Sequence, residues 1–180
     1  MSTVLGIDPG FASLGYAVVE LLPVGERVLA MGVIRTEKSS RKQSVRASDD
    51  NVRRGMVLGA QLEALSVKHG CLAVCAESMS YPRNSSAAAK MSIAWGVVIE
   101  GARHGGIPIV QASPQEIKQS VCGKKTASKD EIGWALDGRF ECRDALAGVP
   151  ESQWEHAYDA LGAVVACLES PVLVMLRRTR

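Results

Sequence analysis

The chain has 180 residues, of which 47% are hydrophobic, and this length and composition suit one compact domain with a substantial core. A net charge of +2 permits a nucleic-acid partner without arguing for one. No apolar run approaches the roughly 20 residues of a membrane-spanning helix, and no basic, apolar leader precedes the first predicted strand. We therefore expect a single domain over residues 1–180 in a soluble, cytoplasmic protein.

Three short runs at the N-terminal end are β-branched or alternate between apolar and polar residues: 3–8, 15–22 and 27–35. Glycine and proline separate them, which predicts three consecutive strands joined as a meander. Apolar residues then recur at helical spacing between 45 and 69, and Gly70 is placed to end that helix. The residues expected to face the core are Val52, Met56, Val57, Leu62 and Leu65.

The second half alternates strands and helices. CLAVCAE, 71–77, is typical of a fully buried strand, and the stretch from 85 to 104 is apolar on most faces, as in a helix covered on two sides. A strand over 107–112 precedes Ser113-Pro114-Gln115-Glu116, which has the residues of a capping box, and a further helix start is expected at Thr126 or Ser128. The final helix is predicted over 154–169. This order indicates a mixed sheet covered by helices on both faces.

The final predicted helix has its core stripe at Ala157, Leu161, Val164 and Leu168. The five cysteines are an odd number without a CxxC pair, and two of them lie in the apolar 71–77 run. We expect all five to be reduced and buried: Cys71, Cys75, Cys122, Cys142 and Cys167.

Acidic residues end two predicted strands and lie on one flank of the final helix. Asp8 and Glu77 are the strand ends, and His156 and Asp159 are three residues apart in HAYD. If the first and fourth strands are neighbours, the carboxylates meet at one edge of the sheet, where clustered like charges normally hold cations. Oxygen ligands suit Mg²⁺ or Mn²⁺, and two such ions about 4 Å apart promote phosphodiester displacement. Taken singly, each residue also has an ordinary explanation, because Asp-Pro-Gly is a common turn and the others suit solvated positions.

Four stretches resemble the RuvC-type Holliday-junction resolvases, in the same order and over nearly the whole chain. They are GIDPGFASLGYAVVE, AVCAE, KMSIAWGVVIEGARHGGIPIVQASPQEIKQSVCGKKTASK and HAYDALGAVVAC. The resemblance implies a ribonuclease H-like α/β fold, with a five-stranded sheet of three antiparallel and then two parallel strands. It also implies an endonuclease that resolves four-way DNA junctions by paired symmetric nicks.

The resemblance assigns the metal-binding roles to the four residues Asp8, Glu77, His156 and Asp159. Asp8 would bridge two Mg²⁺ ions, Mn²⁺ being a substitute, and His156 would complete one shell or position the water. HAYD carries an imidazole where some relatives have a carboxylate, which lowers the negative charge of the site. Lys118 and Lys129 match lysines that act on the scissile phosphate, and Lys124 and Lys125 lie between them as candidate phosphate contacts.

The DNA-binding expectations are broader. Tyr81 lies one position beyond the place where the family often has an aromatic wedge, and Arg83 follows it. The basic segment 35–54, with Arg41 and Lys42, and the Arg-rich C-terminal end would contact the arms of the junction. Two symmetric cuts imply a homodimer, for which 85–104 is the candidate interface, and a branch-migration helicase is a candidate partner.

Three other functions remain to be separated from junction resolution. A related nuclease would act more broadly on branched DNA such as forks and flaps. A phosphate-binding ATPase or sugar kinase also opens on a strand with Asp and Gly, but it needs a second nucleotide-binding half. A catalytically silent DNA-binding module would not need all four site residues.

Overall fold

The computed structural model describes residues 2–79 and 84–178. Within them, one sheet has the strand order β3-β2-β1-β4-β5. The first three strands pair antiparallel, whereas β4 runs parallel to β1 and β5 parallel to β4. This confirms the predicted mixed sheet. The strands are β1 Ser2–Asp8, β2 Ser13–Leu21, β3 Glu26–Arg35, β4 Cys71–Glu77 and β5 Ile109–Ala112.

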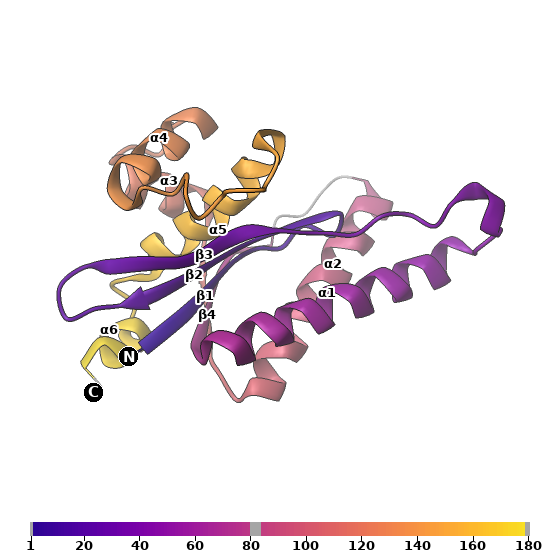
Figure 1. Ribbon diagram of the computed structural model, residues 1–180, viewed down its shortest axis with the longest axis horizontal. Coiled ribbons are helices and arrows are strands. Elements are labelled where there is room, and N and C mark those ends of the chain that lie inside the picture. The colour runs from indigo at the N-terminus through magenta and orange to yellow at the C-terminus, as the bar shows by residue number, and fades with distance from the viewer. Residues whose placement is uncertain (1, 80–83, 179–180) are drawn as a thin grey trace.

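Helices cover both faces of the sheet (Figure 1). α1 and α2 lie on one face, and α3, α4 and α5 lie on the other, with α6 near the chain termini. The helices are η1 Arg41–Gln43, α1 Ala47–His69, α2 Ser85–Gly105, α3 Pro114–Cys122, α4 Lys129–Phe140, η2 Glu151–Gln153, α5 Trp154–Cys167 and α6 Pro171–Arg178, where η marks a 3-10 helix.

Among the described helices, none is by itself long and apolar enough to cross a membrane. The segments 151–167 and 171–178, which meet at a bend of 81°, pass a test of length and composition only when taken together. The first of them contains α5, the most buried helix of the fold.

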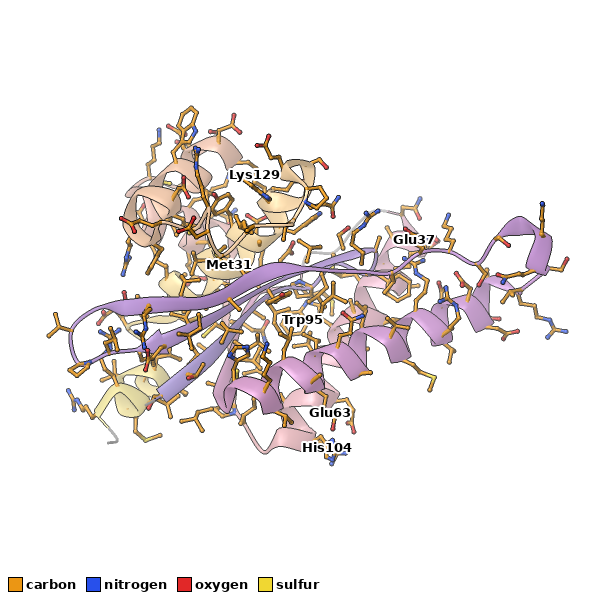
Figure 2. All side chains as sticks on the ribbon, in the orientation of Figure 1. Met31, Glu37, Glu63, Trp95, His104 and Lys129 are labelled. Atoms are coloured by element: carbon orange, nitrogen blue, oxygen red, sulfur yellow. The ribbon has the colours of Figure 1, made fainter. Side chains whose placement is uncertain are left out.

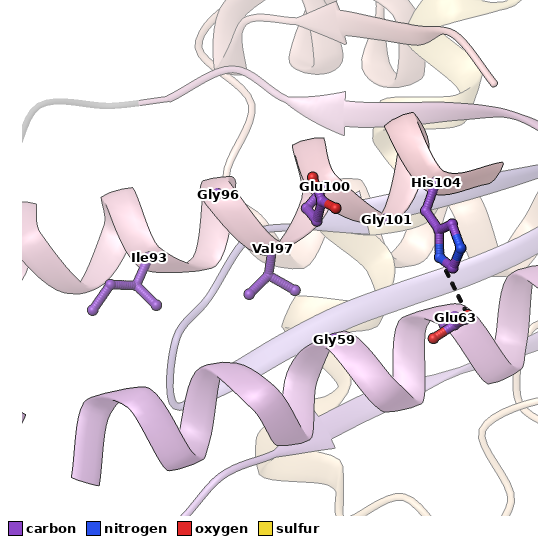
Figure 3. A pocket seen from close by; sticks show the side chains of 8 residues that line it. All are labelled: Gly59, Glu63, Ile93, Gly96, Val97, Glu100, Gly101 and His104. Atoms are coloured by element: carbon purple, nitrogen blue, oxygen red, sulfur yellow. Dashed lines mark ion pairs between the residues drawn. The ribbon is translucent and has the colours of Figure 1, made fainter. Parts of the chain in front are cut away.

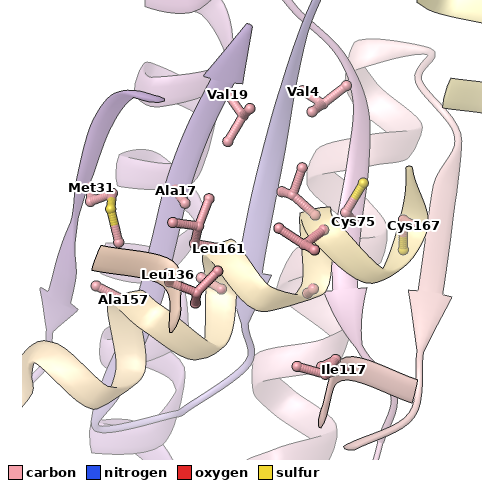
Figure 4. Packing of buried hydrophobic residues seen from close by; sticks show 14 of the residues in the cluster. Val4, Ala17, Val19, Met31, Cys75, Ile117, Leu136, Ala157, Leu161 and Cys167 are labelled. Atoms are coloured by element: carbon pink, nitrogen blue, oxygen red, sulfur yellow. The ribbon is translucent and has the colours of Figure 1, made fainter. Parts of the chain in front are cut away.

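Alternation along the strands divides the core into two clusters. Val4 of β1 and Cys75 of β4 point toward α5, as Figure 4 shows, whereas Leu5 and Ile7 point toward α1 and α2. Trp95 of α2 fills the space between the sheet and the α1–α2 layer (Figure 2). A strand that is covered by helices on both faces has no solvent-exposed side along its length. A carboxylate in such a strand can therefore reach solvent only at the strand end, at the edge of the sheet.

Helix ends follow the predicted capping residues. Ser113 Oγ accepts a hydrogen bond from Glu116 N at 3.3 Å, and Glu116 Oε2 accepts one from Ser113 N at 2.7 Å. Ser128, rather than Thr126, caps α4 through the same reciprocal pair with Glu131. Gly70 ends α1 in the left-handed region at φ 58°, where glycine carries no steric penalty.

The predicted inner face of α1 is wrong in its first half. Val52 and Met56 are 63% and 71% exposed, whereas Arg54, Leu58 and Leu62 are buried at a spacing of four residues. Asp50 precedes them on the same stripe. Arg54 occupies an inward position because Thr36 supplies its polar partners there. Val52 and Met56, on either side of it in the sequence, therefore point outward.

Three further sequence expectations need correction. The helix predicted as the final one, 154–169, ends at Cys167 and is followed by α6. Four of the cysteines are buried and all five are free thiols, but Cys122 is only partly buried. Leu168 is likewise half-buried, while Ala157, Leu161 and Val164 are buried as predicted.

Candidate active site

Asp8 and Glu77 lie at neighbouring strand ends and on one face of the sheet. β1 and β4 run parallel, and Ile7 pairs with Ala76 immediately before the two carboxylates. Alternation places Glu77 on the same face as Cys75, and Asp8 on the same face as Val4. Both side chains therefore emerge at the carboxyl edge of the sheet, facing α5.

α5 rests directly on the backbone of β1 and β2 because two strand residues have no side chain. A Cβ atom on Gly15 would overlap the carbonyl oxygen of His156, and one on Gly6 would overlap the carbonyl oxygen of Ala160. Gly15 is also the cross-strand neighbour of Asp8. These glycines were not among the predicted site residues, although a glycine inside a strand signals a close backbone approach.

This packing delivers His156 and Asp159 to the carboxylates. The Nδ1 atom of His156 lies 2.9 Å from Oδ2 of Asp8, and the two side chains are 29% and 19% exposed. The hydrogen bond to Asp8 raises the pKa of His156, against the opposing effect of burial. Asp159 is buried three residues further along the same helix. Asp8 and Asp159, which are 151 positions apart in the chain, are thus neighbours.

The carboxylates affect one another. Burial, followed by the charges of Asp8 and Asp159, raises the pKa of Glu77 to about 7. Burial also raises the pKa of Asp159, and the neighbouring Lys129 opposes this change. A buried acid whose pKa is raised by other acids is a site that gains from a cation.

The lysines nominated from the sequence occupy different positions. Lys129, the first residue of α4, contacts the Asp159 carboxylate. Burial lowers the pKa of Lys129, but Asp159 together with the charges of Glu77 and Asp8 raises it overall. Lys118 on α3 is half-buried, and its charge lowers the pKa of Glu77, which places it beside the same cluster. Lys124 instead pairs with Glu131, and Lys125 is exposed.

The donor set fits a hard divalent cation. Three carboxylates converge here with one imidazole, which matches the oxygen-rich ligation of Mg²⁺ and Mn²⁺. Within residues 2–79 and 84–178, no three His, Cys, Asp or Glu side chains are already arranged around a metal position. Two of these side chains already have other partners: Lys129 contacts Oδ2 of Asp159, and His156 contacts Oδ2 of Asp8. A cation that binds Asp159 therefore shares this carboxylate with Lys129 or competes with it.

Comparisons with known proteins show to which family the chain is related. The family model described as "Crossover junction endodeoxyribonuclease RuvC" matches residues 4–165. The chain belongs to the RuvC family. RuvC of Alkalilimnicola ehrlichii is 30% identical over 99% of this chain and 98% of its own, and RuvC of Moorella thermoacetica is 32% identical over 72% of each.

Solved structures show the same fold. Thermus thermophilus RuvC in complex with a Holliday junction substrate is 26% identical, with a TM-score of 0.72 over 92% of each chain. The yeast mitochondrial Holliday junction resolvase Ydc2 is 14% identical, and its TM-score of 0.64 supports the fold alone. RuvC proteins are metal-dependent nucleases, named for cutting crossover junctions.

The predicted DNA contacts of this RuvC-family chain are only partly described. Tyr81 and Arg83 lie outside the described residues, as does the side chain of Arg41. Lys42 is exposed in η1, at the tip of the segment that extends beyond the sheet (Figure 1). At the C-terminal end, Arg177 is bound to Glu26 at 2.6 Å, so its charge is already paired.

Arg54 does not belong to the exposed basic surface. It is 3% exposed, its Nε donates to Thr36 Oγ1 at 3.0 Å, and its guanidinium lies 4.3 Å from the centroid of the Phe11 ring. Burial accordingly lowers its pKa. The residue ties α1 to the loop after β1 and to the residue after β3, so its role is structural.

Arg54→Met should therefore destabilise the protein without changing how DNA binding depends on salt. The loss removes the donor that Arg54 supplies to the hydroxyl and carbonyl oxygens of Thr36, which costs about 2–3 kcal/mol in urea unfolding. Arg46→Met is the matched control for the effect on stability, because it makes the same substitution at an arginine that is exposed. A change in the salt slope of DNA binding for Arg54→Met would contradict this assignment, since each lost phosphate contact changes that slope by about 0.9.

Proposed function

We propose that the chain resolves four-way DNA junctions by paired symmetric nicks, with two Mg²⁺ ions in each active site and Mn²⁺ as a substitute. The observation that carries the proposal is the convergence of Asp8, Glu77 and Asp159 from two strand ends and one helix, beside two lysines. Membership of the RuvC family supports the substrate. A silent DNA-binding module would have no need of this crowded acidic cluster.

The metal ions would be held by Asp8, Glu77 and Asp159, with His156 completing one shell or positioning the attacking water. When bound, they lower the pKa of that water and stabilise the leaving 3′ oxygen. The rigid strand ends and α5 fix the carboxylates, and burial of Asp159 keeps bulk water from competing for its oxygens.

The lysines would bind the phosphate. Lys129 is held on Asp159 before substrate arrives, so its ammonium is already oriented toward the site. Lys118, on the neighbouring helix, offers a second point charge near Glu77. Together they would hold the scissile phosphate and stabilise the negative charge that develops as water adds to phosphorus and the bond to the 3′ oxygen breaks.

Metal binding should depend on pH through Glu77. Its pKa of about 7 in the metal-free protein means that the proton must leave before the carboxylate can bind a cation. Affinity for Mn²⁺, measured by calorimetry, should therefore fall at least about tenfold from pH 8 to pH 6. Glu77→Gln should bind Mn²⁺ weakly at pH 8 and lose most of this pH dependence, whereas equal wild-type affinities at the two pH values would contradict the assignment.

Two symmetric nicks require two active sites related by a two-fold axis, so we propose a homodimer formed through α2. Ile99 of α2 is 53% exposed. On another side of α2, a groove of about 320 Å³ runs between α1 and α2, and Figure 3 shows the Glu63–His104 pair at one end of it. Its glycines leave room for a close approach: Gly59, Gly96 and Gly101. A chain that sediments as a monomer at micromolar concentration would contradict the dimer.

A panel of DNA substrates tests the function. A four-way junction, a fork, a flap and a linear duplex of one sequence should be incubated with Mg²⁺, with Mn²⁺ and with EDTA. We expect paired nicks at symmetric positions of the junction, none in EDTA and little cutting of the duplex. Equal cleavage of the fork and flap would favour the broader branched-DNA nuclease, and equal cleavage of the duplex would exclude both.

A further inference from the structure

The surface beside the active site has one exposed tryptophan that the proposed chemistry does not use. Trp134 of α4 is 73% exposed, whereas Trp95 is buried and Trp154 half-buried with its Nε1 donating to Val149 O at 2.8 Å. Trp134 lines a cleft of about 260 Å³ between α4 and the N-terminal end of α5. This volume lies just below that of ordinary small-molecule pockets, about 300–1,000 Å³, and suits a single flat ring system.

We propose that this cleft binds one unstacked nucleobase of the DNA substrate, with guanine preferred, and that Trp134 is its stacking platform. The proposal rests on the nuclease function above and assigns a base-reading subsite to it. An exposed indole face offers stacking to any base, while groups at the rim discriminate among bases by hydrogen bonding.

The cleft shares a lining residue with the active site. Lys129 lines one end of it and at the same time contacts Asp159. Tyr158, the residue before Asp159, forms part of the wall, and Gly133 lies against it, where a Cβ atom would be 3.6 Å from the ring. A phosphate held by Lys129 therefore has one of its flanking nucleotides at the mouth of the cleft.

The charges around the cleft favour a base over a phosphate. Asp137 is already engaged by Arg143 at 2.9 Å and by the Tyr158 hydroxyl at 3.3 Å. Three other carboxylates line the cleft, and within the described chain none of them has a hydrogen-bond or ion-pair partner: Asp130, Glu151 and Glu155. These groups repel the DNA backbone but accept hydrogen bonds from base N–H groups.

Guanine fits this rim best. Its Watson–Crick edge presents the N1–H and N2–H₂ donors side by side, so one carboxylate can accept two hydrogen bonds in parallel. Thymine has one ring N–H between two carbonyl oxygens, which carboxylates repel. Because the hydrogen-bonding edge of an unstacked base is contacted directly, removing one donor from the guanine should measurably reduce the preference for it.

Binding in EDTA tests the subsite without requiring cleavage. Titration with a four-way junction should quench the tryptophan fluorescence of the wild-type protein, because Trp134 is the exposed indole that a base can cover. Trp134→Ala should abolish most of the quenching and weaken junction binding about 10- to 100-fold, the range typical of base–aromatic stacking. Trp134→Phe should keep most of the affinity and lose the quenching. Val67→Ala, which truncates an exposed side chain on α1, is the matched control.

The base preference is tested by substitution in the DNA. Junctions with guanine, inosine or thymine at each position flanking the cut should show a guanine advantage at one position. Inosine, which lacks the N2 amino group, should lose most of that advantage, and Trp134→Ala should lose all of it. Unquenched wild-type fluorescence or wild-type affinity of Trp134→Ala would overturn the subsite, even if cleavage is normal. Quenching without any metal-dependent cleavage would instead contradict the nuclease function and leave the subsite standing.

Discussion

Asp8→Asn should abolish junction cleavage while leaving junction binding nearly unchanged. The substitution keeps the shape of the side chain but removes the negative charge at the centre of the proposed metal site. Metal ions contribute several kcal/mol to the stabilisation of the transition state, so the rate should fall by about 10³-fold or more. Single-turnover cleavage with Mg²⁺ measures the rate, and a gel-shift titration in EDTA measures binding.

Asp144→Asn provides the control, because Asp144 is an exposed carboxylate that belongs neither to the acidic cluster nor to the lining of the Trp134 cleft. It should cleave at the wild-type rate. The same comparison separates chemistry from folding, since thermal unfolding of Asp8→Asn should differ little from wild type. If Asp8→Asn still cuts the junction at a comparable rate, the carboxylate cluster is not the catalytic site.

The strands and the acidic residues at their ends were accessible from sequence because their signals are local. Asp8 ends a short run with β-branched residues and Glu77 ends a short apolar run, and the predicted bounds of both strands lie within two residues of the observed ones. The pairing of β1 with β4, in contrast, depends on segments that are far apart in the sequence. The resemblance to a known family implies this pairing, and the strand register explains why the two carboxylates share an edge.

The orientation of α1 was not accessible in the same way. Its apolar residues follow a helical repeat whichever face is inward, and the inward face carries Asp50 and Arg54. Arg54 is buried because Thr36 and Phe11 supply its partners from other parts of the chain. The spacing of apolar residues within a helix contains no information about partners from elsewhere in the chain. Hydrophobic periodicity therefore predicts Val52 and Met56 as inward residues.

Contacts between distant segments also decide the character of the active site. Lys129 and Asp159 are 30 residues apart, and their ion pair occupies the carboxylate that the sequence nominated as a metal ligand. The identity of each residue was predicted, whereas their contact depends on how α4 packs against α5. The same packing creates the Trp134 cleft, for which the sequence offered no signal beyond one aromatic residue in a polar helix.

Gly15→Ala should both destabilise the protein and impair cleavage, although residue 15 carries no functional group. Its Cβ would overlap the carbonyl oxygen of His156, so α5 must shift away from the sheet. Overpacking of this kind costs about 3 kcal/mol or more when the obstacle is backbone, which for a chain of this size lowers Tm by roughly 6–12 °C. The shift also moves His156 away from Asp8, which breaks their 2.9 Å contact.

Gly138→Ala is the matched control for this substitution. Gly138 lies in α4, where an added Cβ has open space, so alanine should raise the free energy of unfolding by about 0.5–1 kcal/mol through its better helix propensity. Thermal unfolding and single-turnover cleavage, measured well below the Tm of each variant, separate the two effects. Because α5 carries two of the four proposed ligands, Gly15→Ala should cleave at least tenfold more slowly even when fully folded, by analogy with misplaced catalytic groups. A folded Gly15→Ala protein with wild-type Tm and rate would show that the contact between β2 and α5 does not position the site.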